Sequence, residues 1–175
     1  MNDTLIIAMA GLPASGKSAV AAKLQRALNA VLLDKDRVRD FLFASHVDYS
    51  NEQNDLCLGV MYDVANYLLT TAAPPVVILD GRTYSKRYQV EAVKTAAKRS
   101  NAQLLIIECI CSEESVKARL HNDQDVHLAK DRDFALYQRS KAAAEPIEEP
   151  KLVIETDKSS LEQCLEQALN YVNHT

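Results

Sequence analysis

Residues 11–18 constrain the fold of this chain more than any other segment, because they read Gly-Leu-Pro-Ala-Ser-Gly-Lys-Ser. An apolar run at residues 5–10 precedes this segment, and a helix-forming run at residues 19–24 follows it. Gly11 and Gly16 allow backbone angles that a side chain forbids, so successive N–H groups can converge on phosphate oxygens. A G-x-x-x-x-G-K-S pattern between a strand and a helix predicts a loop that binds the phosphates of a nucleoside triphosphate.

The helix that begins near Lys17 adds its positive dipole end to the predicted phosphate site. We expect ATP and Mg²⁺ as cofactors, with Lys17 reaching the β- and γ-phosphates and the Ser18 hydroxyl ligating the metal. The expected nucleotide-binding residues are Gly11, Leu12, Pro13, Ala14, Ser15, Gly16, Lys17, Ser18 and Ala19.

Short apolar runs alternate with longer amphipathic segments along all 175 residues. Several runs, such as residues 76–79, are continuously apolar, which is typical of strands covered on both faces. The alternation predicts an α/β fold, a three-layer sandwich in which helices cover both faces of a five-stranded parallel sheet. The expected strands are 4–10, 30–33, 76–79, 104–111 and 151–155, and the expected helices are 17–29, 37–43, 52–71, 86–99, 113–120, 132–144 and 161–172.

The predicted helix 52–71 carries an apolar stripe formed by Leu56, Val60, Val64 and Leu68. We interpret this stripe as a face that packs into the core. No linker, repeat or change of composition divides the chain, so we expect one domain over residues 1–175. The pattern leaves the oligomeric state open.

The formal net charge of −4 and the isoelectric point near 5.6 make nucleic acid an unlikely default partner. The four cysteines form no C-x-x-C pattern and no zinc-like spacing with histidine, so we predict a reducing compartment. The sequence has no basic leader before its first apolar run and no apolar stretch that could span a bilayer. We therefore expect a cytoplasmic protein without membrane contact.

Charged side chains follow the predicted strands at the edge where a parallel sheet binds its ligands. Asp80 comes directly after the strand 76–79, where a carboxylate can hold Mg²⁺ directly or through a water. The alternative is that Asp80 only ends the strand and caps the next turn.

Asp36 and Arg39 form a D-x-x-R pattern after the second predicted strand. The spacing places both side chains on one face of a helix. There the carboxylate could accept the proton of a substrate hydroxyl, and the guanidinium could hold a phosphoryl or acidic group. In the alternative interpretation, Asp36 caps the helix and Arg39 makes a surface ion pair. Spacing alone does not separate the two.

Arg82 follows the third predicted strand at the ligand edge, so we expect it to bind the phosphate acceptor together with Asp36 and Arg39. Arg87, His46 and Tyr49 lie in segments that also suit acceptor recognition, although a lone histidine or tyrosine in a loop is usually only exposed.

Together, Gly11–Ser18, Asp36-x-x-Arg39 and Asp80-Gly-Arg-Thr resemble the P-loop kinase group that includes phage-type polynucleotide 5′-kinases, chloramphenicol phosphotransferase, zeta toxins and small predicted AAA-type kinases. The resemblance implies that Asp36 is the catalytic base. It also implies a helical lid, here around residues 113–142, whose arginines clamp phosphates, with Arg119 in the first such place and Arg132 in the second. The chain departs from polynucleotide kinases after Arg119, where it has acidic residues in place of a second basic one.

These observations predict an ATP-dependent kinase that transfers the γ-phosphoryl group to a hydroxyl of a small molecule, with Asp36, Lys17, Arg119 and Arg132 as catalytic residues. One alternative is a polynucleotide 5′-hydroxyl kinase, which the acidic charge disfavours. Another is a nucleotide-binding regulatory protein, although the N-K-x-D signature of guanine-specific switches is absent from the sequence.

Overall fold

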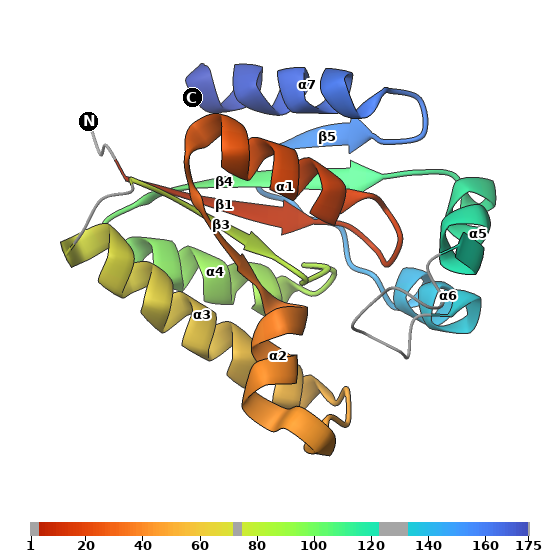
Figure 1. The fold of residues 1–175 in the computed structure, drawn as a ribbon, viewed down its shortest axis with the longest axis horizontal. Coiled ribbons are helices and arrows are strands. Elements are labelled where there is room, and N and C mark those ends of the chain that lie inside the picture. The colour runs from red at the N-terminus through yellow and green to blue at the C-terminus, as the bar shows by residue number, and fades with distance from the viewer. Residues whose placement is uncertain (1–3, 72–74, 123–132, 175) are drawn as a thin grey trace.

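The structure is a computed structural model that describes residues 4–71, 75–122 and 133–174. Parallel strands form one five-stranded sheet in the order β2-β3-β1-β4-β5 (Figure 1). The strands are β1 Leu5–Ala10, β2 Val31–Asp34, β3 Val76–Asp80, β4 Gln103–Ile110 and β5 Lys151–Glu155. The helices are α1 Lys17–Leu28, α2 Lys35–Phe43, the short 3₁₀ helix η1 Ala44–His46, α3 Asn51–Thr71, α4 Arg87–Arg99, α5 Glu113–Asn122, α6 Phe134–Ala142 and α7 Leu161–Asn173.

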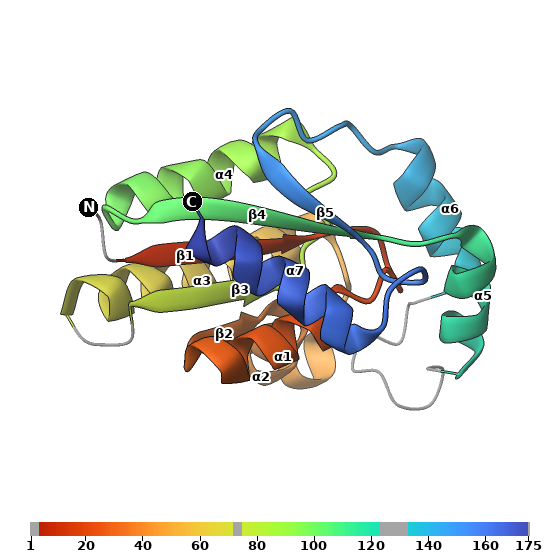
Figure 2. The ribbon, with the colours of Figure 1, turned by 90° about the horizontal axis from the view of Figure 1, so that it is seen from above.

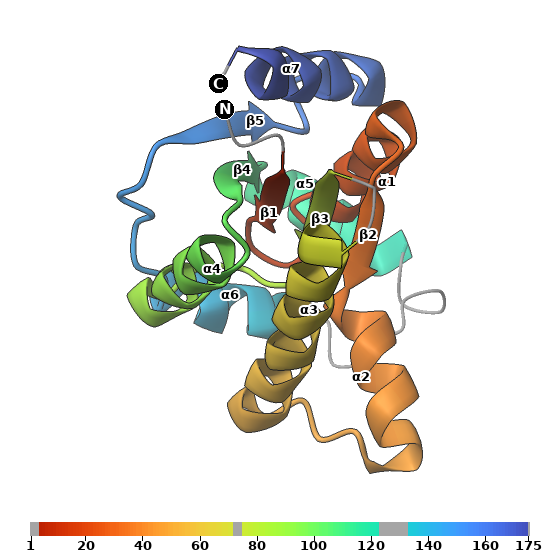
Figure 3. The same ribbon diagram turned by 90° about the vertical axis from the view of Figure 1, so that its left-hand side faces the viewer.

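Helices cover both faces of the sheet, with α1 and α7 on one face and α3 and α4 on the other (Figure 3). Successive side chains of β1 point to opposite faces. Ile6 and Ala8 belong to the core under α3 and α4, whereas Ile7 and Met9 belong to the core under α1 and α7. Because both faces are covered, all four side chains are fully buried, which explains the continuous apolar run. The predicted three-layer α/β fold is confirmed.

The predicted core stripe of α3 is wrong. Leu56, Val60 and Val64 are exposed, and only Leu68 packs partly against the core. The buried residues of the helix are Gln53, Cys57, Leu58, Met61, Ala65 and Leu69. Apolar residues surround much of this helix, so their spacing does not single out one face. The side that faces the core carries Leu58, Met61, Ala65 and Leu69.

Helix α2 begins two residues earlier than predicted, at Lys35, because Asp34 supplies its N-cap. The Asp34 side chain accepts a 2.9 Å hydrogen bond from the Asp36 backbone N–H. This is the usual way in which a carboxylate satisfies one of the free N–H groups at a helix start. The charged run after β2 therefore enters the helix at once instead of forming a loop.

The strands point toward the end of the molecule where α5 and α6 lie, as Figure 2 shows. The loop between β1 and α1 lies at this end, and the register pairs Asp34 at the end of β2 with Asp80 at the end of β3. The fold thus brings the charged strand ends and the predicted phosphate loop to one edge. Among the described residues, no helix has the length and apolar character needed to cross a bilayer.

Candidate active site

The predicted phosphate loop connects β1 to α1, and close backbone packing fixes its first residue. Gly11 has φ +134°, and a Cβ there would collide with the backbone carbonyl of Cys109. The Gly11 N–H donates a 3.1 Å hydrogen bond to the Thr83 carbonyl, which follows β3. Gly16, at φ +87°, is the N-cap of α1. It has no side chain to occupy the helix N-terminus, which suits that end of α1 for an anion.

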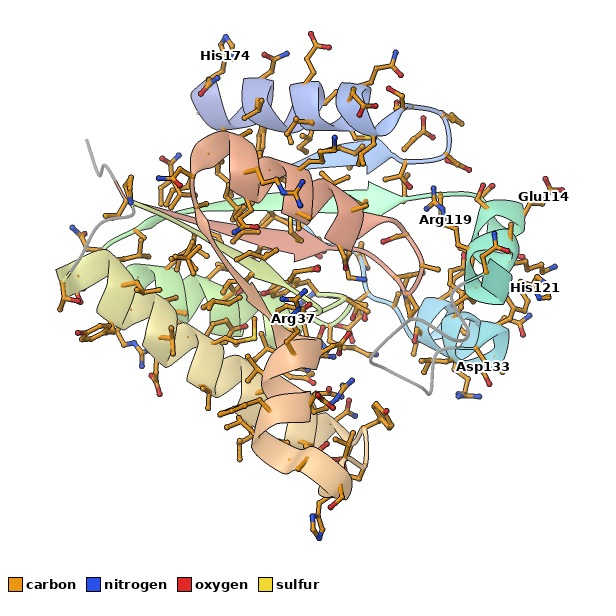
Figure 4. The ribbon with its side chains drawn as sticks, viewed as in Figure 1. Arg37, Glu114, Arg119, His121, Asp133 and His174 are labelled. Carbon is orange, nitrogen blue, oxygen red and sulfur yellow. The ribbon has the colours of Figure 1, made fainter. Side chains whose placement is uncertain are left out.

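Two residues far along the chain hold the outer side of the loop. The Thr156 hydroxyl donates a 2.7 Å hydrogen bond to the Ser15 carbonyl. Arg119 of α5 donates from Nη1 to the Ala14 carbonyl and to the Thr156 hydroxyl, both at 3.0 Å. Its Nη2 donates to the Thr156 carbonyl at 3.1 Å. Figure 4 shows Arg119 extending from α5 toward the body of the molecule. In this structure Arg119 binds the loop itself.

Of the cavities that border the loop, two are lined by Lys17. The first, which we call the loop cavity, has a volume of about 340 Å³. It is lined by residues 14–20 together with Arg119, Thr156, Leu161 and Cys164. The second, which we call the strand-end cavity, has a volume of about 220 Å³. Its lining includes residues that follow β2 and β3, notably Lys35, Asp36, Arg39, Gly81, Arg82 and Thr83.

Lys17 and Ser18 line both cavities. Lys17 is 8% exposed, and its Nζ donates to the Leu12 carbonyl at 3.4 Å, so the side chain folds back over the loop. A group bound at these two residues can therefore be reached from either side. The nine predicted nucleotide-binding residues form the loop and the first turn of α1 beside the loop cavity.

Asp80 is buried at the end of β3, and only 2% of its surface is exposed. Its Oδ1 has no hydrogen-bond partner among the described residues. Asp34 lies opposite in the sheet, and burial first, followed by the negative charges of Asp80 and Asp36, raises the pKa of the Asp34 carboxyl. The carboxylates at the ends of β2 and β3 repel each other, so a cation bound beside them would be stabilising.

The residues at this edge fit a magnesium ion. A buried carboxylate oxygen without a partner is costly unless a ligand satisfies it. Asp80 would supply that oxygen, and Ser18 would supply a hydroxyl. Within the described ranges, no group of three His, Cys, Asp or Glu side chains forms a metal cage. This agrees with the habit of Mg²⁺, which binds through one or two protein oxygens together with phosphate oxygens and waters.

Asp36 and Arg39 form a largely buried pair that lines the strand-end cavity. Arg39 is 3% exposed, and its Nη2 lies 2.9 Å from Asp36 Oδ1. Its Nη1 donates to Asn54 Oδ1 at 2.8 Å, and its guanidinium carbon lies 4.5 Å from the centroid of the Tyr49 ring. Lys35 Nζ lies 3.4 Å from the same Asp36 oxygen. The alternative that Asp36 caps α2 and Arg39 makes a surface pair is wrong, because Asp34 is the cap and Arg39 is buried.

Arg82 lines the same cavity and is tied to two helices. Its Nη2 contacts Asp55 Oδ1 of α3 at 2.5 Å and donates to the Tyr88 hydroxyl of α4 at 2.9 Å. Gly81, at φ +91°, precedes it, and a Cβ at Gly81 would lie 2.8 Å from Lys35 Cβ. A glycine at this position therefore lets β3 end against the first turn of α2.

Of the other side chains predicted to suit acceptor recognition, one lines the strand-end cavity and the others lie outside it. Tyr49 lines the strand-end cavity, whereas His46 is exposed on η1. Arg87 is 76% exposed in its side chain and pairs with Glu148 at 3.5 Å, away from that cavity. Arg132 lies outside the described residues.

Several residues that build the site carry no motif. Lys35 belongs to the charged run after β2, which is a weak signal. Asn54, Gln89 and Thr156 belong to no motif, and they reach the site only through the folded arrangement of the chain.

Comparisons with known proteins agree with this fold. A family model described as AAA domain (AAA_33) matches residues 6–163. A structure from Chloroflexus aurantiacus has a TM-score of 0.77 at 17% identity, covering 97% of this chain and 98% of that one. The Mycobacterium tuberculosis APS kinase CysC, in complex with AMPPNP and APS, has a TM-score of 0.70 at 16% identity, covering 97% and 98%. A gluconokinase from Sinorhizobium meliloti has a TM-score of 0.65 at 16% identity, covering 97% and 91%.

These likenesses show the fold of P-loop kinases. Among curated proteins, no match to the chain is found.

Proposed function

We propose a function on the premise that the chain belongs to the AAA domain family, whose model matches most of its length. The proposed function is that of an ATP-dependent kinase that transfers the γ-phosphoryl group to a hydroxyl of a small molecule. We also propose that residues 1–175 form one domain, with a lid around residues 113–142. The P-loop kinase fold supports a phosphotransferase.

The observation that carries this proposal is the position of Lys17 and Ser18 between the two cavities. A triphosphate on the loop would fill the loop cavity and present its γ-phosphoryl group at these residues. An acceptor in the strand-end cavity would meet it from the other side. A switch protein needs only the first cavity, so the second favours transfer to a bound acceptor.

In the proposed reaction, the acceptor hydroxyl oxygen bonds to the γ-phosphorus while the bond from that phosphorus to the β–γ bridging oxygen breaks, and ADP leaves. Asp36 orients the hydroxyl and accepts its proton, which then passes to solvent. Arg39 and Lys35 hold the carboxylate in place. Phosphoryl transfer has a loose transition state, so positioning by Asp36 contributes alongside its basicity.

Lys17 and the loop N–H groups would hold the phosphates, and Ser18 with Asp80 would hold Mg²⁺, which supplies neutralisation of phosphate charge when bound. Arg119 and Arg132 are proposed to neutralise charge on the transferring group. For Arg119 this requires that its guanidinium exchange its contacts with Ala14 and Thr156 for phosphate oxygens.

The test is the Asp36→Asn variant, which keeps the shape of the side chain and removes its basicity. ADP release with Mg·ATP and a panel of hydroxylated metabolites should fall by about 10²–10⁴-fold, while the Kd for Mg·AMPPNP changes by less than about twofold. Asp40→Asn, on the same helix and outside both cavities, is the matched control. Near-normal transfer by Asp36→Asn would remove Asp36 as the base. Stabilisation of the protein by Mg·GTP but not by Mg·ATP would remove ATP as the donor.

A further inference from the structure

The strand-end cavity carries more positive than negative charge. Its lining includes Lys35, Arg39 and Arg82 in addition to Lys17, which the proposed function assigns to the nucleotide. Asp36 is the one carboxylate among the described residues that line it. Arg39 and Arg82 are only 3% and 6% exposed, so their charges have lost most of their contact with water. Buried charges of this kind need partners.

The partners are unevenly distributed. Asp36 is shared, because its Oδ1 lies 2.9 Å from Arg39 and 3.4 Å from Lys35. Arg39 has further contacts with Asn54 and Tyr49, so its guanidinium is well satisfied. Lys35 Nζ lies farther from the shared oxygen, at 3.4 Å. Burial lowers the pKa of its ammonium, so an anionic ligand beside Lys35 would stabilise the charged form. Lys35 therefore has positive charge to offer a ligand.

Arg82 also has capacity left. Among the described residues, both of its hydrogen bonds start from Nη2, toward Asp55 and Tyr88. Its Nε and Nη1 groups remain for a ligand in the cavity that it lines. Because Nη2 belongs to both bidentate edges of the guanidinium and is already engaged, the remaining groups suit single hydrogen bonds to a carboxylate or phosphate oxygen.

Gln89 places an uncharged hydrogen-bond acceptor in the lining of the cavity. It is 8% exposed and lines the cavity, and its Oε1 has no hydrogen-bond partner within the described ranges. An unsatisfied buried oxygen is destabilising, and a hydrogen bond donated by a ligand hydroxyl would remove this cost. The volume of about 220 Å³ lies below the roughly 300–1,000 Å³ of drug-sized sites. It suits a compound no larger than a monosaccharide.

We propose that the acceptor is a small polyhydroxyl compound that carries one anionic group, a carboxylate or a phosphate monoester, which Lys35 and Arg82 bind while a second hydroxyl donates to Gln89. This inference rests on the proposed function and narrows it. Cationic acceptors such as aminoglycosides are excluded by the repulsion of the lining, and neutral polyols lack the group that the cations bind.

The first experiment measures binding separately from transfer. Sugar acids, sugar phosphates, alditols and amino sugars of four to six carbons are added to the Mg·AMPPNP complex, and the melting temperature and Kd are measured. The anionic compounds should bind at least about tenfold more tightly than the matched alditols, and the amino sugars should not bind. Equal binding of alditols, or no binding by any anionic compound, would overturn the inference.

The second experiment uses variants. Gln89→Glu adds a negative charge of nearly the same shape, and Arg82→Met removes a positive one. Each should raise the Kd of the anionic compounds about tenfold or more, and Gln89→Glu should leave alditol binding within about twofold. Gln103→Glu, exposed at the start of β4, and Arg87→Met, outside the cavity, are the matched controls and should change nothing. Equal effects of Gln89→Glu on anionic and neutral compounds would contradict the proposed charge recognition.

ADP release with Mg·ATP then tests the kinase reaction separately from the anionic nature of the acceptor. An anionic compound that binds and is phosphorylated supports both. Binding by the anionic class without any transfer would support the ligand class and refute the kinase reaction. Transfer to neutral or cationic compounds alone would support the kinase and refute the anionic acceptor.

Discussion

Replacing Thr156 with valine tests whether the fold prepares the phosphate loop for its ligand. The Thr156 hydroxyl donates to the Ser15 carbonyl at 2.7 Å and accepts from Arg119 Nη1 at 3.0 Å. Thr156→Val keeps the branched shape and removes both bonds, together with a longer contact of the same hydroxyl to the Ile110 carbonyl at 3.3 Å. Arg119 keeps its contacts with the carbonyls of Ala14 and Thr156, so α5 remains attached to the loop.

The size of the effect follows from these two bonds. A neutral hydrogen bond contributes about 0.5–1.5 kcal/mol and one to a charged group about 1.5–3 kcal/mol. The arginine loses only one of its three acceptors, so we take the total as about 2 kcal/mol. If half of this free energy stabilises the loop geometry that the nucleotide uses, the Kd for Mg·AMPPNP rises about fivefold, because about 1.4 kcal/mol corresponds to tenfold.

Titration calorimetry with Mg·AMPPNP measures the effect on nucleotide binding, and urea unfolding independently measures the effect on the stability of the fold. Thr95→Val is the matched control, since that hydroxyl makes one exposed bond to the Glu91 carbonyl on α4, far from the loop. We expect a weaker nucleotide complex for Thr156→Val and an unchanged one for Thr95→Val. A loss of about 2 kcal/mol in unfolding free energy with an unaltered nucleotide Kd would refute the reasoning, because the bond would then stabilise the fold without preparing the loop.

Two further predictions concern stability. Burial and neighbouring charges raise the pKa of the Asp34 carboxyl above 3.8, so the folded state keeps this proton to a higher pH than the unfolded state does. Asp34 therefore lowers the free energy of unfolding as the pH rises from the unfolded pKa through the folded pKa. Asp34→Asn retains a capping oxygen and removes the charge, so its melting temperature should exceed that of the wild type at pH 7 and match it near pH 3; a lower value at pH 7 would show that the charge is needed. On α3, Met61→Ala should cost about 2–5 kcal/mol in urea unfolding because its side chain is buried, whereas Leu56→Ala should stay within about 0.5 kcal/mol, and similar losses for both would contradict the observed orientation of the helix.

The sequence predicted the fold class because its strongest signals are local. Continuous apolar strands and the phosphate loop each occupy one short segment, and the layers follow from their alternation. The face of α3 was predicted wrongly for a physical reason. Leu56, Val60 and Val64 have the right spacing for a core stripe, but so do Met61, Ala65 and Leu69. Only the tertiary packing of the helix decides between them.

The candidate site was predictable to the same extent. Lys17, Ser18, Asp36 and Asp80 were identified because each follows a strand or belongs to a motif. Thr156 was not, since it meets Ser15 across 141 positions of the chain. The sequence also left open whether Asp36 caps the helix. Asp34 caps α2, which leaves Asp36 to line the cavity.

The N-terminal part of α3, which carries no motif, positions the two arginines of the strand-end cavity, where the acceptor is proposed to bind. Asn54 holds Arg39, and the adjacent Asp55 holds Arg82, so two consecutive residues position both cavity arginines. Neither residue belongs to the lining of the loop cavity. The charge presented to an acceptor can therefore change through this part of α3 while the phosphate loop and its nucleotide contacts stay the same. For this reason the loop motif alone predicts the phosphate donor and leaves the acceptor undefined.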